Sequence, residues 1–95
     1  MPMFVVLGRF TDEGAKNLAD LVSGIEQNSA RAESLGIKNH GWYMTQGHYD
    51  YLVIAEAPDA ETIMKQVIGV SSSGRARTET LRAFTLDEIR QLLQT

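Results

Sequence analysis

Two histidines and an aspartate that could do chemistry stand close together in the middle of the chain, at His40, His48 and Asp50. Imidazole and carboxylate groups are ligands that several metals accept, but this spacing matches no recognised metal motif. We therefore expect surface histidines beside a turn and no bound metal. A histidine can also act as a general base near neutral pH, and Asp50 could orient His48 for that role. The competing interpretation is a structural role for Asp50 in the turn.

Aromatic side chains crowd the same stretch, at Trp42, Tyr43, Tyr49 and Tyr51. In a cavity they could line a flat ligand and offer hydroxyl groups to it. Residues of this kind also pack commonly in cores and in dimer interfaces. Both interpretations stay open at the level of sequence.

Charged residues that could bind an anion lie outside this stretch, at Arg9 and at Arg77, Glu79 and Arg82. Inside a barrel formed by two subunits, an arginine would hold a carboxylate through two parallel hydrogen bonds. On an edge strand, the same charges deter pairing with another sheet. The sequence identifies no catalytic residue, since it has no glycine-rich phosphate loop and no HExxH-like pair. The ligand-binding candidates are Arg9, His40, Tyr43, His48, Tyr49 and Asp50.

Strands must position most of these side chains. Residues 3–7 and 51–55 are unbroken apolar runs rich in β-branched and aromatic residues, which favours strands covered on both faces. Residues 37–45 and 75–84 are more polar, as edge strands are. Residues 46–50, between the strands at 37–45 and 51–55, have the composition of a hairpin turn. Gly47 tolerates positive φ, and Asp50 can close an Asx-type bond to nearby backbone.

Helical periodicity fills the intervening segments. Thr11 is a natural N-cap for a helix that ends before Gly36, and Gly24 in its middle favours a bend or break over residues 24–29. Asp59 caps a second amphipathic helix, which the serine-rich loop at residues 71–74 follows.

A short helix is predicted at the end of the chain. The segment from Thr85 to Glu88 has the spacing of a capping box, and Ile89, Leu92 and Leu93 give the following helix one apolar side.

This order of elements predicts an α+β fold of the ferredoxin-like βαββαβ type, with a four-stranded antiparallel sheet and a short C-terminal helix. The first and third strands take the central positions, which agrees with their apolar runs. Both main helices pack on one face, so the apolar side chains of the other face would stand in water. We therefore expect two copies to pack these open faces together as a dimeric α/β barrel, in a homodimer or in a higher homo-oligomer.

Composition sets further bounds. The 95 residues make one domain, 1–95, and the absence of cysteine excludes disulfides and thiolate chemistry. A net charge of −3 argues against binding to nucleic acid, which requires a basic surface. No apolar run approaches the roughly 20 residues of a transmembrane helix, and the N-terminus lacks the basic start of a signal peptide. We expect a cytoplasmic protein without a cofactor.

The tetrad Gly47-His48-Tyr49-Asp50 resembles the namesake motif of the GYD-domain family, a glycine, an aromatic residue and an aspartate at the head of an apolar strand. Residues 7–14 resemble the family's first strand and its exit into a helix, and residues 77–84 resemble its last strand. The resemblance implies a ferredoxin-like fold of the dimeric barrel type and no settled activity. The role we expect is a self-associating module that binds a small, partly aromatic or anionic ligand. The expected pocket lies between the sheet and the helices or at the dimer interface. Alternatives are a cofactor-independent monooxygenase or isomerase, by analogy of fold, and a purely structural assembly module.

Overall fold

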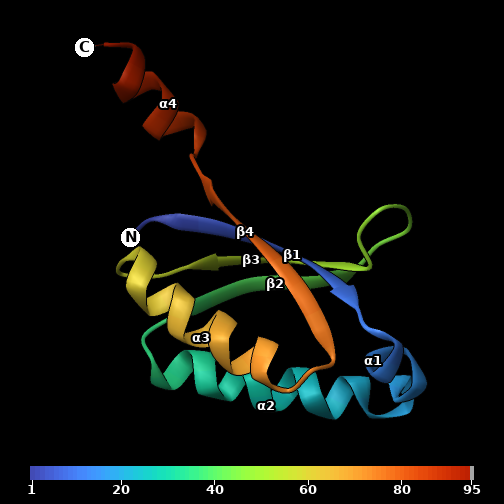
Figure 1. Ribbon diagram of the computed structural model, residues 1–95. Helices are drawn as coiled ribbons and strands as arrows, with labels where there is room; N and C mark the ends of the chain where they lie inside the picture. Colours follow the sequence, from blue (N-terminus) through green and yellow to red (C-terminus); the bar gives the residue numbers. More distant parts are fainter. Residues whose placement is uncertain (95) are drawn as a thin grey trace.

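A four-stranded antiparallel sheet with two long helices on one face is the framework of the computed structural model, which describes residues 1–94 (Figure 1). The sheet order is β2-β3-β1-β4, so the two apolar strands are central and the two polar strands form the edges, as predicted. The elements along the chain are β1 (Met3–Phe10), α1 (Asp12–Lys16), the 3-10 turn η1 (Leu18–Asp20), α2 (Leu21–Ser34), β2 (Lys38–Met44), β3 (Tyr51–Glu56), α3 (Ala60–Ser72), β4 (Ala76–Ala83) and α4 (Leu86–Leu93). The fold is the predicted α+β, ferredoxin-like one.

Alternation along the central strands divides the sheet into two faces. Val6 of β1 lies opposite Val53 of β3, and their neighbours Val5 and Ile54 form the next pair. Paired residues share a face, so these two pairs point to opposite sides. The face towards the helices carries the buried core, which consists of Phe4, Ala32, Ile37, Ala55, Ala57 and Ile63.

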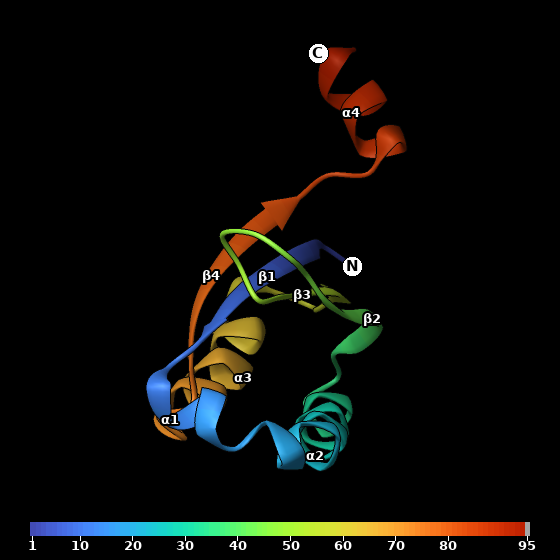
Figure 2. The ribbon, with the colours of Figure 1, turned by 90° about the vertical axis from the view of Figure 1, so that its right-hand side faces the viewer.

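Helices α2 and α3 lie side by side beneath the sheet (Figures 1 and 2). Polar groups join them: Arg31 of α2 donates from Nη2 to the carbonyl oxygen of Lys65 at 3.0 Å, and Gln66 of α3 donates to the carbonyl oxygen of Asn28 at 2.8 Å. Gly69 makes room for this contact, because a Cβ atom there would lie 1.7 Å from Arg31 Nη1. The other face of the sheet has no helix packed on it within the described residues.

The predicted break in the first helix occurs earlier than expected. The prediction placed it at residues 24–29, whereas α2 runs unbroken through Gly24 and the interruption lies between α1 and α2. The cause is the tight docking of α1 against the start of β4. A Cβ atom at Gly14 would lie 2.0 Å from the carbonyl oxygen of Arg75, and Thr11 donates to the carbonyl oxygen of Gly74 at 2.7 Å. The chain must therefore change direction before α2 can run beneath the sheet.

The predicted N-cap of α3 and the predicted C-terminal end of α2 are confirmed. The side chain of Asp59 accepts from the backbone of Thr62 at 2.7 Å and caps α3. At the end of α2, Gly36 has φ +82°, and Ile37 N–H donates to the carbonyl oxygen of Ala32 at 3.0 Å. This is a Schellman motif, which satisfies carbonyl groups that the helix leaves open. The predicted serine-rich loop is shorter than expected, because α3 continues through Ser72.

Helix α4 stands away from the rest of the molecule (Figures 1 and 2). Thr85 and Glu88 form the predicted capping box. Arg82 of β4 reaches Glu88 with an N–O distance of 3.1 Å, and its guanidinium lies 4.2 Å from the ring centre of Phe84. These contacts hold the start of α4 on the end of β4. Among residues 1–94, no helix is both long and apolar enough to cross a membrane.

Candidate functional site

The hairpin loop between β2 and β3 folds against the end of β1. The carboxylate of Asp50 accepts a hydrogen bond from Phe10 N–H at 2.8 Å, and Asp50 N–H donates to the carbonyl oxygen of Gly8 at 2.8 Å. Gly47 has φ +108°, the conformation for which the sequence favoured glycine. Asp50 is therefore structural, but it ties the loop to β1 instead of closing the expected Asx-type bond within the turn.

Next to this anchor lies a polar group that we call the hairpin cluster, formed by Arg9, His48, Tyr49 and Glu79. The Arg9 guanidinium hydrogen-bonds Nε2 of His48 and lies 5.4 Å from the ring centre of Tyr49. This contact occupies the nitrogen lone pair that a general base would need. Asp50 does not orient His48, since its carboxylate binds the backbone of β1.

Tyr49 completes the cluster by donating its hydroxyl to the carboxylate of Glu79 on β4. This hydrogen bond is the main cause that raises the pKa of Tyr49, followed by burial and the negative charge of Glu79, while Arg9 opposes the shift. The phenol consequently stays protonated at neutral pH. The arrangement braces the loop against β1 and β4.

The remaining candidates lie elsewhere. His40 Nε2 is 2.5 Å from Glu56 Oε1, at the opposite end of the β2–β3 hairpin from His48. Tyr43 lies on the sheet face away from the helices and is 55% exposed. Within residues 1–94, no three His, Asp or Glu side chains come close enough together to hold a metal ion. Of the six candidates, Arg9, His48, Tyr49 and Asp50 are together, and the other two are apart.

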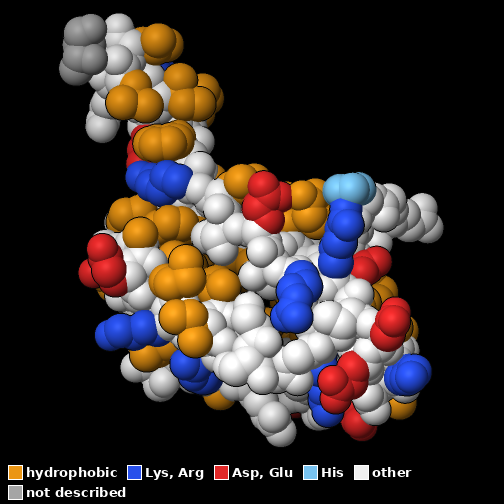
Figure 3. Space-filling view, viewed as in Figure 1, with side chains coloured by type: hydrophobic (Ala, Val, Ile, Leu, Met, Phe, Trp, Pro, Cys, Tyr) orange, Lys and Arg blue, Asp and Glu red, His pale blue; other side chains and the backbone are white. Residues whose placement is uncertain are grey.

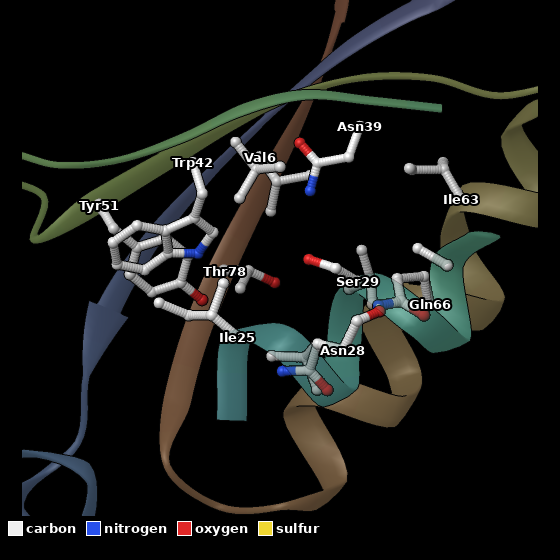
Figure 4. A pocket seen from close by; sticks show the side chains of 14 residues that line it. Val6, Ile25, Asn28, Ser29, Asn39, Trp42, Tyr51, Ile63, Gln66 and Thr78 are labelled. Carbon is white, nitrogen blue, oxygen red and sulfur yellow. The ribbon is translucent and has the colours of Figure 1, made fainter. Parts of the chain in front are cut away.

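A cavity of about 90 Å³ lies between the sheet and helices α2 and α3, which is one of the two places where the sequence analysis expected a pocket (Figure 4). None of the six candidate residues lines it. The rings of Trp42 and Tyr51 stack at its side, with centres 4.9 Å apart and planes inclined by 16°. The sequence had grouped these two aromatics with Tyr43 and Tyr49. Strand pairing separates them, because Trp42 shares the helix face with its partner Val53 while Tyr43 points the other way.

Gly8 permits the position of Tyr51. A Cβ atom at Gly8 would lie 2.1 Å from Cζ of the Tyr51 ring, so only a glycine allows the ring to lie flat on the backbone of β1. Burial raises the pKa of the Tyr51 hydroxyl. The Tyr51 ring packs on Gly8 and stacks with Trp42. The aromatic side of the cavity therefore depends on a glycine in β1.

An antiparallel sheet with helices on one face, an uncovered second face and a cavity beneath the sheet defines a ferredoxin-like α+β protein. The chain belongs to the GYD domain family, whose model matches residues 4–93. This confirms the resemblance seen in the tetrad from Gly47 to Asp50.

Relatives agree with this assignment. A protein of Thermus thermophilus named glutamine synthetase and cystathionine beta-lyase binding protein is 31% identical over 90 residues, which cover 94% of this chain and 95% of the relative. The crystal structure of TTHA0845, also from Thermus thermophilus, is similar with a TM-score of 0.54 at 25% identity, covering 90% of this chain and 95% of that one. The crystal structure of FFRP-DM1 is similar with a TM-score of 0.62, covering 88% of this chain and 100% of that one; at 16% identity it shows the fold alone.

Proposed function

We propose that this protein is a self-associating, protein-binding module whose residues 1–95 act as one domain and whose copies pair through the open faces of their sheets. The observation that carries the proposal is the apolar character of that face. Along the central strands it presents Val5, Leu7, Leu52 and Ile54, and beside them Leu81 of β4 is 43% exposed. Contiguous exposed apolar patches are typical of protein interfaces.

The accessible surface supports pairing with a second copy. The chain exposes 6328 Å², whereas a compact protein of 10.5 kDa exposes about 5,400 Å². The excess of about 900 Å² is close to the roughly 800 Å² that each partner buries in a stable interface. A second copy is the occupant that presents the same apolar face in return.

Helix α4 supports the same partner. Leu86, Ile89 and Leu93 lie at i, i+3 and i+7 and share one side of the helix, where Leu86 is 64% and Leu93 80% exposed. Figure 3 shows hydrophobic side chains along much of this helix. The ion pair of Arg82 with Glu88 holds the first turn of the helix at the end of β4, and the helix stands away from the rest of the molecule (Figures 1 and 2). In the proposed dimer, this stripe packs on the other copy.

Sedimentation velocity over a range of micromolar concentrations tests the pairing. We expect the wild-type protein to sediment at twice 10.5 kDa, and Leu52→Arg to sediment as a folded monomer, because it places a charge in the middle of the open face. Ala30→Arg, at an exposed position of α2, is the matched control and should stay dimeric. A wild-type monomer at all concentrations would contradict the proposal.

Binding to another protein is supported by the Thermus relative, whose name says that it binds glutamine synthetase and cystathionine beta-lyase. We infer a partner of the same kind for this chain. Purified glutamine synthetase or cystathionine beta-lyase from the organism that produces this chain should co-sediment with the wild-type protein. Lack of co-sedimentation with either enzyme would remove the protein-binding half of the proposal and leave self-association to its own test.

A further inference from the structure

The cavity beneath the sheet has the features of a binding site. Its lining comes from the sheet, α2 and α3, and it carries no charged side chain among the described residues. Apolar groups such as Val6, Ile25 and Ile63 make up much of the wall, and the Trp42–Tyr51 stack forms one side (Figure 4).

Four polar groups point into the same central space in Figure 4: the indole N–H of Trp42, the side-chain amide nitrogen of Asn39 and the hydroxyls of Ser29 and Thr78. Asn39 is oriented by its own oxygen, which accepts from Gly41 N–H at 2.9 Å. Within residues 1–94, none of the four groups makes a hydrogen bond to the protein. Two are donors only, and the hydroxyls can donate or accept.

We propose that this cavity binds a small neutral molecule with a flat apolar body and a carbonyl-type oxygen. Aromatic stacking suits a planar body, and the convergent donors suit an acceptor atom. A charged ligand is disfavoured, because the wall offers no opposite charge to offset the loss of its hydration. The proposal goes beyond the pairing of subunits and does not depend on it, since the open face lies on the other side of the sheet.

An entrance exists on the side of α1 and η1. A wider cleft of about 430 Å³ shares Ile25, Asn28, Trp42, Tyr51 and Val70 with the cavity, and its outer part is lined by polar residues such as Glu13 and Arg75. A neutral molecule could pass from this cleft to the aromatic stack without unfolding a strand. The volume of the cavity limits the body to about the size of a single aromatic ring.

Benzamide and benzoate are a matched pair of probes, since they have the same shape and differ in charge. Trp42 is the only tryptophan in the sequence, so its fluorescence and its indole N–H resonance report on the cavity alone. We expect benzamide to shift the indole resonance in a saturable manner, and benzoate to bind at least about tenfold more weakly. No shift with benzamide at millimolar concentration would overturn the proposal, and equal binding of benzoate would overturn the claim that the ligand is neutral.

Variants of the lining place the probe. Ser29→Phe fills the cavity and should abolish the benzamide shift, whereas Ala30→Phe, at the next and exposed position of α2, should leave it unchanged. Thr78→Val keeps the shape and removes one hydroxyl, so it should weaken binding about fivefold. A benzamide shift that persists in Ser29→Phe would show that the probe binds elsewhere and would overturn the assignment. A dimer that dissociates, or the absence of a protein partner, would leave these results unaffected.

Discussion

Replacing Gly8 by alanine adds one methyl group, and we expect it to destabilise the protein. The new methyl group would meet the Tyr51 ring at 2.1 to 2.6 Å, which is far too close for a carbon contact. We expect Gly8→Ala to lower the free energy of unfolding by about 1–3 kcal/mol and to change the fluorescence of Trp42, because the stack must move. Denaturant unfolding followed by fluorescence measures both.

Gly24→Ala is the matched control. Gly24 lies within α2, and nothing stands within 4 Å of a Cβ atom there. The substitution should raise the free energy of unfolding by about 0.5–1 kcal/mol through helix propensity. If both variants moved the unfolding midpoint in the same direction, the explanation by ring contact would be wrong.

Tyr49 and Glu79 make a pH-dependent pair. Their hydrogen bond raises the pKa of Tyr49 above its ordinary value, so the folded state holds the phenolic proton more tightly than the unfolded state does. The associated stability is present below a pH of about 10 and is lost as the pH rises through the pKa of folded Tyr49. Glu79→Ala should lower that pKa and reduce the alkaline loss of stability. Phenolate absorbance, taken as the difference from Tyr49→Phe, measures the titration; an unchanged curve would contradict it.

At the scale of elements, α4 depends on its first turn. The backbone N–H of Thr85 is the main cause that lowers the pKa of Glu88, and Arg82 adds to the shift. The stability that this carboxylate gives is therefore present above a pH of about 4.3 and is lost as the pH falls through the lowered pKa. We expect amide exchange in α4 to accelerate on acidification. Glu88→Gln can still form a capping box, so its α4 should respond less to acid. The same acid response in both proteins would contradict this account.

Local signals predicted most elements correctly. The N-caps at Thr11, Asp59 and Thr85 and the positive φ of Gly36 depend on neighbours within a few residues, so the sequence pattern contained them. The interruption between α1 and α2 was misplaced because its cause, the carbonyl group of Arg75 against α1, lies far along the chain.

The candidate site was predictable in part for the same reason. Tyr49 and Asp50 lie in the hairpin loop with His48, and the loop meets Arg9 because β3 pairs with β1. The partner of Asp50 could not be read from the sequence, since it is backbone forty residues away. A pocket between the sheet and the helices was expected, but its lining residues were not identified, because they depend on which parity of each strand faces the helices.

For the whole molecule, the apolar stripe of α4 offers a test that separates folding from assembly. The radius of gyration is 14.2 Å, compared with about 12.4 Å for a compact chain of this length, as expected when one helix stands apart.

Replacing Leu86, Ile89 and Leu93 together by glutamine should leave the stability of the monomer nearly unchanged, because these side chains are exposed within it. The dissociation constant of the dimer should be at least about tenfold higher than that of the wild-type protein. Sedimentation equilibrium measures the dissociation, and Gln91→Ala, an exposed change on the same helix, is its control. Unchanged dissociation would remove α4 from the proposed interface.

In the two central strands, side chains alternate between the cavity and the open face, so neighbouring residues belong to different surfaces. Tyr51 and Val53 belong to the side of the cavity, while Leu52 and Ile54 belong to the open face. Point substitutions can therefore alter one surface and spare the other, but the insertion or deletion of one residue in β3 would exchange both at once. Over evolutionary time, these strands can drift in side chain while their length stays fixed, and gaps should accumulate in the loops that join them.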